Sequence, residues 1–294
     1  MPTGFESHLN PPFSVIAPAR QLAPFVFDSP HSGRNYTPQF LASIRLNRRD
    51  IRRSEDFRVD ELFAEAANLG CPLLAANFPR AFLDVNREAW ELDPRMFCDP
   101  LPPGCNTRSA RVSGGLGTIA RVVAEREEIY ARKLSFAEAV ERVETLYKPY
   151  HAMLGRLLTE TKARFGHAIL IDCHSMPTNR ETARRADIVL GDRYGTSCAP
   201  MLVEAAAIIL KDLGFEVEIN KPYAGGFITE HYGRPAAGFH ALQFEISRNL
   251  YMDEARIEKH SGFASTAKAM RTFAERLIGL PEACFAANPA LAAE

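Results

Sequence analysis

The chain has 294 residues, of which 46% are hydrophobic and 24% charged, a composition typical of a globular protein and not of a disordered one. Its 35 basic and 36 acidic residues give a formal net charge of −1, which argues against nucleic acid or a membrane surface as the main partner. The length allows two domains of average size, but a single α/β domain often reaches it, and we expect one domain over residues 1–294.

The termini and the cysteines indicate a cellular compartment. The first ten residues show no basic patch followed by an apolar run, so no signal peptide is predicted. No uncharged apolar stretch of about 18 residues occurs, so no membrane span is expected. The six cysteines form no C-x-x-C pair, which favours reduced thiols in the cytoplasm and argues against a cysteine zinc site.

In the first half of the chain, apolar runs alternate with helical spacing. Short strands are predicted at residues 24–28, 72–76 and 81–85. The segment Phe57–Leu69 has the spacing of a helix, and Gly70 ends it. Residues 91–118 are rich in Pro, Gly and Cys, so we expect a long loop of the kind that often forms a functional lid.

The second half continues the alternation. A helical stretch is predicted over 119–165, with breaks near Ser135 and Pro149. Further strands are predicted at residues 167–172, 187–190, 215–220 and 239–246, and further helices at 199–212 and 261–279. The Ala/Pro-rich residues 280–294 are expected to form a C-terminal tail. Strands alternating with helices predict an α/β fold in which helices cover a sheet.

Polar side chains stand where four of the predicted strands end. They are His31, the pair Asn86 and Arg87, His174, and Glu245. Ligands of open α/β sheets bind beyond the carboxyl ends of strands, so parallel neighbouring strands would bring these side chains into one crevice. Two imidazoles with carboxylates suit Zn²⁺ and leave a position for water, and an arginine suits a substrate carboxylate. The set therefore favours a hydrolase that acts on an anionic amide.

Each of these residues also has an ordinary structural explanation. His31 could bond the backbone of a turn, Arg87 could form a surface ion pair, and Asp56 could be a helix N-cap. Glu245 lies among apolar neighbours, and a buried carboxylate needs a metal, a cation or a proton. The convergence of the set, more than any single residue, supports the catalytic interpretation.

Several segments resemble those of N-formylglutamate amidohydrolases and occur in that family's order. They are PHSGRNYTP at 30–38, SEDFRVDELF at 54–63, LDVNR at 83–87, IDCHSMP at 171–177 and the long segment at 225–254. The family is related to the zinc carboxypeptidases and aspartoacylases. The resemblance implies their three-layer α/β/α sandwich with a mixed, largely parallel sheet, and one divalent ion, zinc.

The resemblance also implies the metal ligands, with one departure. His31 and His174 match histidine ligands of the wider group. Zinc carboxypeptidases carry H-x-x-E, but the three residues that follow His31 are Ser, Gly and Arg, so that glutamate is missing. The acidic segment at 54–63 takes its place, and we assign the third ligand to Asp56, with Glu55 as the alternative.

The activity implied is hydrolysis of N-formyl-L-glutamate to formate and L-glutamate in histidine degradation. Glu245 would move the proton of the attacking water, and His231 would stabilise the developing oxyanion. The D-x-N-R segment at 84–87 would bind the α-carboxylate, and the second carboxylate of this dianion calls for a second cation. The implied substrate-binding residues are Asn86, Arg87, Arg234 and, as the alternative second cation, Arg80.

Two other functions stay open. A metal-dependent deacylase of another N-acyl amino acid, such as N-formyl- or N-acetyl-aspartate, would need the same site, because one methylene shifts specificity only about 10–200-fold. A metal-free small-molecule-binding protein would keep the pocket alone, but the presence of both histidines and Glu245 argues against it. The expected ligand in the enzymatic cases is a small anionic N-acyl amino acid.

Overall fold

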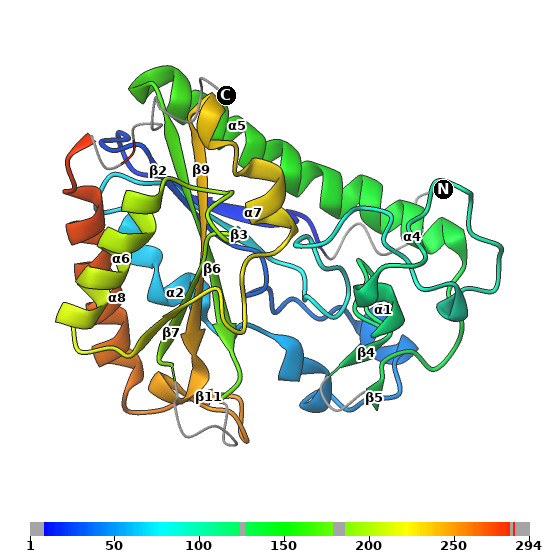
Figure 1. The fold of residues 1–294 in the computed structure, drawn as a ribbon. Coiled ribbons are helices and arrows are strands. Elements are labelled where there is room, and N and C mark those ends of the chain that lie inside the picture. Colours follow the sequence, from blue (N-terminus) through cyan, green and yellow to red (C-terminus); the bar gives the residue numbers. More distant parts are fainter. Residues whose placement is uncertain (1–8, 124–126, 179–185, 283–284, 286–294) are drawn as a thin grey trace. The chain divides into compact units, whose positions relative to one another are not determined.

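The computed structural model describes residues 9–123, 127–178, 186–282 and 285 (Figure 1). The chain divides into two compact units. Unit 1 comprises Met1–Ser14, Pro30–Glu55 and Ala75–Met153, and unit 2 comprises Val15–Ser29, Asp56–Leu74 and Leu154–Glu294. Most of the tail predicted at 280–294 lies outside the described residues. Among the described helices, none combines the length and apolar character that a membrane span requires.

A seven-stranded sheet forms the centre of the fold. Its strands, in spatial order, are β1 (Phe13–Ile16), β3 (Leu73–Ala76), β2 (Phe25–Ser29), β6 (Ala168–Met176), β9 (Phe239–Ser247), β7 (Ile188–Gly191) and β8 (Val217–Ile219). The strand β6 pairs in parallel with both β2 and β9, and β7 pairs in parallel with β8. Among the pairs of this sheet whose register is described, only β7–β9 is antiparallel. The mixed, largely parallel sheet predicted from the sequence is confirmed.

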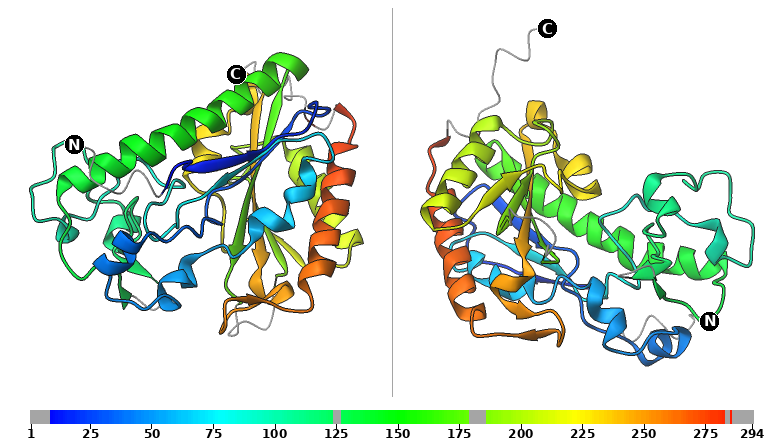
Figure 2. Two further views of the ribbon diagram at one scale, coloured as in Figure 1. Left: turned by 180° about the vertical axis from the view of Figure 1, so that it is seen from behind. Right: turned by 60° about the horizontal axis from the view of Figure 1, so that its bottom comes forward.

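Helices cover both faces of the sheet in unit 2 (Figures 1 and 2). On one face lie α2 (Val59–Leu62), α6 (Pro200–Asp212) and α8 (Phe263–Ile278), whose buried side chains join one apolar core with the strands. On the other face α7 (Phe227–Tyr232) packs against β6 and β9. This arrangement is the expected α/β sandwich.

The two faces of the central strands differ in chemistry. Alternate residues, among them Phe27, Ile171 and Phe244, point into the apolar core. The intervening positions of the same strands carry buried polar side chains, namely Asp28, Asp172, His174, Gln243 and Glu245. Because the strands are in register, these residues form two rows on one face. In one row Asp172 lies between Asp28 and Gln243, and in the other His174 lies beside Glu245.

The helix predicted over 57–69 is divided into two short pieces. The α-helix α2 ends at Leu62, and a 3₁₀ turn covers Ala64–Ala66. Phe63 leaves the helical conformation, and its ring packs against Phe27 and Phe244 with centroid distances of 6.1 and 5.3 Å. Tertiary packing thus overrides the helical periodicity here.

The strand predicted over 81–85 is wrong. The N–H groups of Phe82 and Leu83 both donate to the Pro79 carbonyl, at 2.9 and 3.2 Å, so the segment is a turn. Its side chains are nonetheless buried, with Leu83 fully inaccessible. A short apolar run signals burial, and periodicity cannot tell a buried strand from another buried segment.

The stretch predicted as helical over 119–165 differs at both of its expected breaks. It contains β4 (Val122–Val123), β5 (Glu127–Glu128), α4 (Phe136–Arg142), a π-helical turn (Val143–Tyr147) and α5 (Lys148–Phe165). Ser135 starts the helical part as its N-cap and forms a capping box with Glu138. The break predicted near Pro149 is wrong, because the π-helical turn leads directly into α5, which contains Pro149. Pro149 has no backbone N–H to donate, and the π-helical turn lies immediately before this part of the helix.

The long loop predicted at 91–118 is confirmed as largely irregular chain. It contains only a 3₁₀ turn (Pro94–Met96) and the short helix α3 (Ala110–Ser113). A function as a lid stays a prediction. The remaining described elements are α1 (Pro38–Ser43), β10 (Met252–Asp253), β11 (Glu258–Lys259) and 3₁₀ turns at Asp50–Ser54, Pro235–Ala237 and Arg248–Leu250.

Because of one buried histidine, His240, we expect the folded protein to lose stability in acid. Burial, together with the nearby His167, lowers the pKa of His240 to about 4, and its Nδ1 accepts the N–H of Ala199, the N-cap of α6, at 3.1 Å. Below about pH 6.5 the unfolded chain takes up a proton that the folded chain does not, so stability falls as the pH drops from about 6.5 to 4. The loss reaches about 3 kcal/mol for this pKa difference.

The variant His240→Asn is expected to flatten this pH dependence, because the amide oxygen can accept the same N–H without titrating. Urea unfolding of both proteins at pH 7 and pH 5 measures the difference. An equal loss of stability on acidification in the variant and the parent protein would assign the effect to other groups.

Candidate metal centre

His31 lies two residues beyond the end of β2 and is almost completely buried, with an exposed fraction of 1%. Its Nε2 lies 2.7 Å from Oδ1 of Asp84. The same carboxylate accepts the backbone N–H of Asn86 at 2.8 Å and Nε of Arg80 at 3.1 Å. With Nε2 engaged by Asp84, Nδ1 is the ring nitrogen that His31 can offer to a metal.

Neighbouring positive charges keep the Asp84 carboxylate ionised. Burial alone would raise its pKa, but the charges of Arg87, His31 and Arg80 together hold the pKa well below its usual range. Nη2 of Arg87 lies 3.7 Å from Oδ2 of Asp84. Asp84 is therefore an ionised acceptor that fixes the orientation of the His31 ring.

Asp56 directs its carboxylate to His174 instead of capping a helix. The N-cap of α2 is Arg58, while Oδ2 of Asp56 lies 2.9 Å from Nδ1 of His174. The other oxygen accepts from the Ser175 hydroxyl at 3.2 Å and from the Arg248 guanidinium at 3.5 Å.

Glu55, the alternative third ligand, has a different partner. Its two carboxylate oxygens accept Nε and Nη2 of Arg52 at 2.9 and 3.2 Å. This bidentate pair neutralises the Glu55 charge. The geometry thus favours Asp56 over Glu55 as the carboxylate of the histidine cluster.

His174 is held between two carboxylates. It lies on the polar face of β6, with Nδ1 2.9 Å from Asp56 and Nε2 2.8 Å from Oδ1 of Asp172. Burial by itself would lower the pKa of His174, but Asp172, Asp56 and Glu245 together raise it well above the usual value. A site that attracts a proton this strongly is also suited to a divalent cation, which would replace the proton on one nitrogen.

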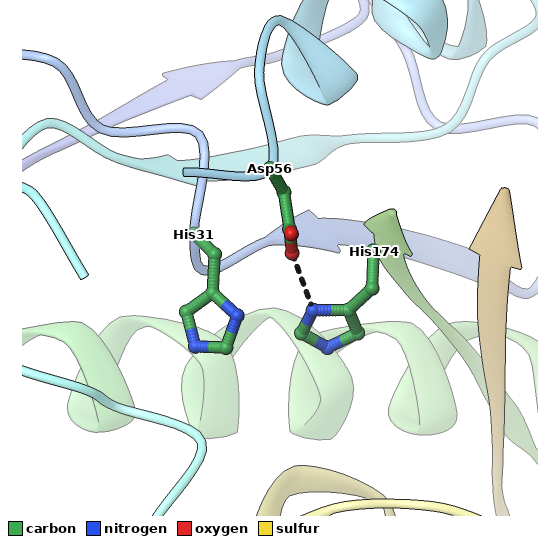
Figure 3. Close-up of side chains that lie close together, drawn as sticks. All are labelled: His31, Asp56 and His174. Atoms are coloured by element: carbon green, nitrogen blue, oxygen red, sulfur yellow. Dashed lines mark hydrogen bonds and ion pairs between the residues drawn. The ribbon is translucent and has the colours of Figure 1, made fainter. Parts of the chain in front are cut away.

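Together, His31, Asp56 and His174 form a buried cluster that can hold a metal ion (Figure 3). One ligand atom of each residue lies within 4.8 Å of the others, and Figure 3 shows the three side chains converging on a common point. Ligands about 2.0–2.2 Å from a tetrahedral ion are about 3.3–3.5 Å apart, so small side-chain movements would complete the geometry. Two imidazoles and one carboxylate fit Zn²⁺ and leave a position for water.

Glu245 lies on the same face of the sheet as His174, on the neighbouring strand β9. It lies in register with His174, has an exposed fraction of 8%, and its Oε1 accepts from Nε2 of Gln243 at 3.0 Å. The sequence therefore places an acid beside the cluster on a rigid central strand. This position suits a group that moves protons at the metal site.

The other predicted residues have the following surroundings. Nη1 of Arg87 donates to the Asn86 carbonyl at 2.7 Å, and its Nε donates to the Leu116 carbonyl at 2.9 Å. His231, in the last turn of α7, is largely exposed and stacks on Phe227, and partial desolvation and the charge of Arg234 lower its pKa. Arg234 is exposed, with its guanidinium 5.1 Å from the ring centre of Phe239. Their roles toward substrate stay predictions.

Sequence reasoning missed two residues that support the cluster. Asp172 precedes His174 by two positions, and because alternate residues of a strand share a face, the D-x-H pattern could have indicated their contact. Arg248, in the 3₁₀ turn after β9, contacts Asp56 across 192 positions of sequence. No local pattern could have shown that contact.

Comparison with known proteins identifies the family of this chain. The profile of the family "N-formylglutamate amidohydrolase" matches residues 23–252. The chain is 28% identical to the N-formylglutamate deformylase of Pseudomonas putida, over 79% of this chain and 82% of that protein. It is also 28% identical to the N-formylglutamate deformylase of Pseudomonas aeruginosa, over 82% of this chain and 86% of that one.

The solved structures give the same result. The crystal structure of N-formylglutamate amidohydrolase from Ralstonia eutropha JMP134 superposes with a TM-score of 0.86. It shares 36% sequence identity, and the match covers 91% of this chain and 97% of that one. The fold, the order of the motifs and the matched length together show that this chain belongs to the N-formylglutamate amidohydrolase family.

Proposed function

We propose that this protein hydrolyses N-formyl-L-glutamate to formate and L-glutamate, with one zinc ion held by His31, Asp56 and His174. Membership of the family makes it a hydrolase that acts on amide bonds. The observation that carries the finer proposal is the buried His-Asp-His cluster, whose donor set suits zinc. A place in histidine degradation and a cytoplasmic location, which the scattered cysteines favour, are part of the proposal.

In this proposal, neighbouring polar and charged side chains hold the metal ligands in place. Asp84 orients His31, and Asp56 is held at its second oxygen by Ser175 and Arg248. A bound dication supplies Lewis acidity, which acidifies water and polarises an amide carbonyl. Co²⁺ and Mn²⁺ accept the same ligands, so metal analysis of the purified protein is the test of zinc.

Glu245 performs the proton transfers in this proposal. Its carboxylate takes a proton from the attacking water while a C–O bond forms at the formyl carbon. It then gives that proton to the nitrogen of glutamate as the C–N bond breaks, and formate leaves. The hydrogen bond from Gln243 orients the carboxylate. His231 would stabilise the oxyanion by hydrogen bonding.

The substrate is a dianion, and the proposed binding residues supply cationic and amide groups. Arg87 and Asn86 would hold the α-carboxylate, and Arg234, or Arg80 in its place, the side-chain carboxylate. Arg80 and Arg87 both lie against Asp84, which in turn contacts His31. This shared partner links the proposed anion-binding arginines to the His31 side of the cluster.

Arg87→Ala is expected to raise KM for N-formyl-L-glutamate about 10–100-fold, because a charge-assisted hydrogen bond to the substrate is lost. A smaller loss of kcat would follow if Arg87 also orients the amide. The matched control is Arg156→Ala, which removes an exposed arginine whose partner is Glu160. An unchanged KM together with a lowered unfolding midpoint would show that Arg87 only supports the carbonyls of Asn86 and Leu116.

The proposed reaction itself is tested with a substrate panel. Formate release from N-formyl-L-glutamate and N-formyl-L-aspartate, and acetate release from their N-acetyl analogues, are measured at equal enzyme and zinc concentrations. We expect the highest kcat/KM with N-formyl-L-glutamate. A preference for another member of the panel would replace the substrate and keep the metal site, and absence of both zinc and turnover would support a binding protein.

A further inference from the structure

The side chains of Tyr147 and His151 contact the chain segment 84–87, which carries two of the proposed substrate-binding residues. The Tyr147 hydroxyl donates to the Arg87 carbonyl at 2.7 Å, and Nε2 of His151 lies 2.9 Å from the Val85 carbonyl. We infer that Tyr147 and His151 are positioning residues, which keep this segment in the conformation that binds the substrate α-carboxylate. This inference rests on the proposed function, in which the segment binds that carboxylate.

The segment 84–87 belongs to no helix or strand, although Val85 and Asn86 are buried. Some of its hydrogen bonds are internal. The Asp84 carboxylate accepts the N–H of Asn86 at 2.8 Å, and Nη1 of Arg87 donates to the Asn86 carbonyl at 2.7 Å. The carbonyls on either side of Asn86 are bound instead by side chains of a helix. The conformation of the segment therefore depends on donors that lie outside it.

The two donors lie on one side of a continuous helical stretch. Tyr147 is the last residue of the π-helical turn, and His151 lies in the first turn of α5. Side chains four positions apart share a helix face, and the centroids of the two rings are 4.3 Å apart. Turns of this kind occur frequently at functional sites. The donors and the segment all belong to unit 1, so the contact lies within one compact unit.

The chemistry of the two contacts sets what each side chain must supply. A carbonyl oxygen only accepts hydrogen bonds, so the Tyr147 hydroxyl and Nε2 of His151 both act as donors. Tyr147 is buried, so its loss would leave the Arg87 carbonyl without this partner. An irregular segment with fewer fixed carbonyls can adopt other conformations. Its substrate-binding side chains would then be in place for less of the time, and KM would rise.

The first test is the KM for N-formyl-L-glutamate of zinc-loaded Tyr147→Phe, which removes one hydroxyl and keeps the ring. We expect KM to rise about 3–10-fold, the effect of one hydrogen bond, while kcat changes by less than about twofold. Zinc content should equal that of the parent protein, because the candidate metal cluster consists of His31, Asp56 and His174. Steady-state formate release and metal analysis measure these quantities.

Tyr130→Phe is the matched control, because it makes the same substitution at another buried tyrosine of unit 1. The Tyr130 hydroxyl accepts Nη1 of Arg142 at 2.7 Å. Its removal should lower the unfolding midpoint and leave KM within about twofold of the parent value. An equal rise of KM in Tyr130→Phe and Tyr147→Phe would show a general loosening of unit 1 and would overturn the positioning role.

A pair of variants at His151 tests the second contact independently. Leucine cannot donate a hydrogen bond, whereas the amide of glutamine can donate to the Val85 carbonyl in place of Nε2. We expect His151→Leu to raise KM about 3–10-fold and His151→Gln to stay within about twofold of the parent protein. Equal KM values for the two variants would overturn the role of the His151 donor. This pair also supplies the test if Tyr147→Phe does not fold.

A merely structural role of both side chains predicts a different pattern. In that case Tyr147→Phe and His151→Leu would lower the unfolding midpoint and leave KM unchanged. That result would overturn the inference while the proposed function stands. If the zinc-loaded parent protein releases no formate from N-formyl-L-glutamate, the proposed function is refuted, and this inference with it.

Discussion

Glu245→Gln is expected to retain one zinc ion per chain and to lose about 10²–10⁴-fold in kcat, because an amide cannot take the proton of the attacking water. The substitution preserves the shape of the side chain, and the amide oxygen can still accept the hydrogen bond from Gln243. Steady-state formate release and metal analysis of the same preparation measure the two quantities. The loss should appear in kcat more than in KM, since proton transfer belongs to the chemical step.

The control for this variant is Glu160→Gln, which changes an exposed acid on α5 whose partner is Arg156. It should leave kcat unchanged. Near-normal turnover of Glu245→Gln would remove Glu245 as the base. A variant that lost its zinc together with its activity would instead make Glu245 part of the metal site.

His174→Ala is expected to abolish both metal binding and activity. It removes the ligand that lies between Asp56 and Asp172 and leaves those two buried carboxylates without their shared cation. Metal content should fall from about one ion per chain to a background level, and the unfolding midpoint should no longer rise when zinc is added.

The matched control is His260→Ala, because among the described residues the imidazole of His260 hydrogen-bonds only backbone groups, those of Asn249 and Gly262. This variant should keep its zinc and its turnover. Full zinc occupancy in His174→Ala would refute its role as a ligand, and zinc loss with retained activity would refute the metal mechanism.

Much of the sheet could be predicted because its central strands are buried and therefore rich in apolar residues. The runs at 24–28, 72–76 and 239–246 became β2, β3 and β9 within one or two residues. Errors arose where burial did not mean strand pairing, as in the turn at 81–85. Another arose where the ring of Phe63 met the sheet and the helix ended early.

The residue types of the site, and their nearness to strands, could be predicted because local periodicity and motif order are properties of neighbouring residues. His174 was expected beyond a strand that ends at residue 172, but it lies within β6, which continues to Met176. Which of these side chains come together was decided by the tertiary structure. It placed Asp56 against His174 and Glu55 against Arg52, although the two acids are adjacent in the chain. It also brought Asp172 and Arg248 to the cluster, because buried charges are stable only beside partners that the folded chain supplies.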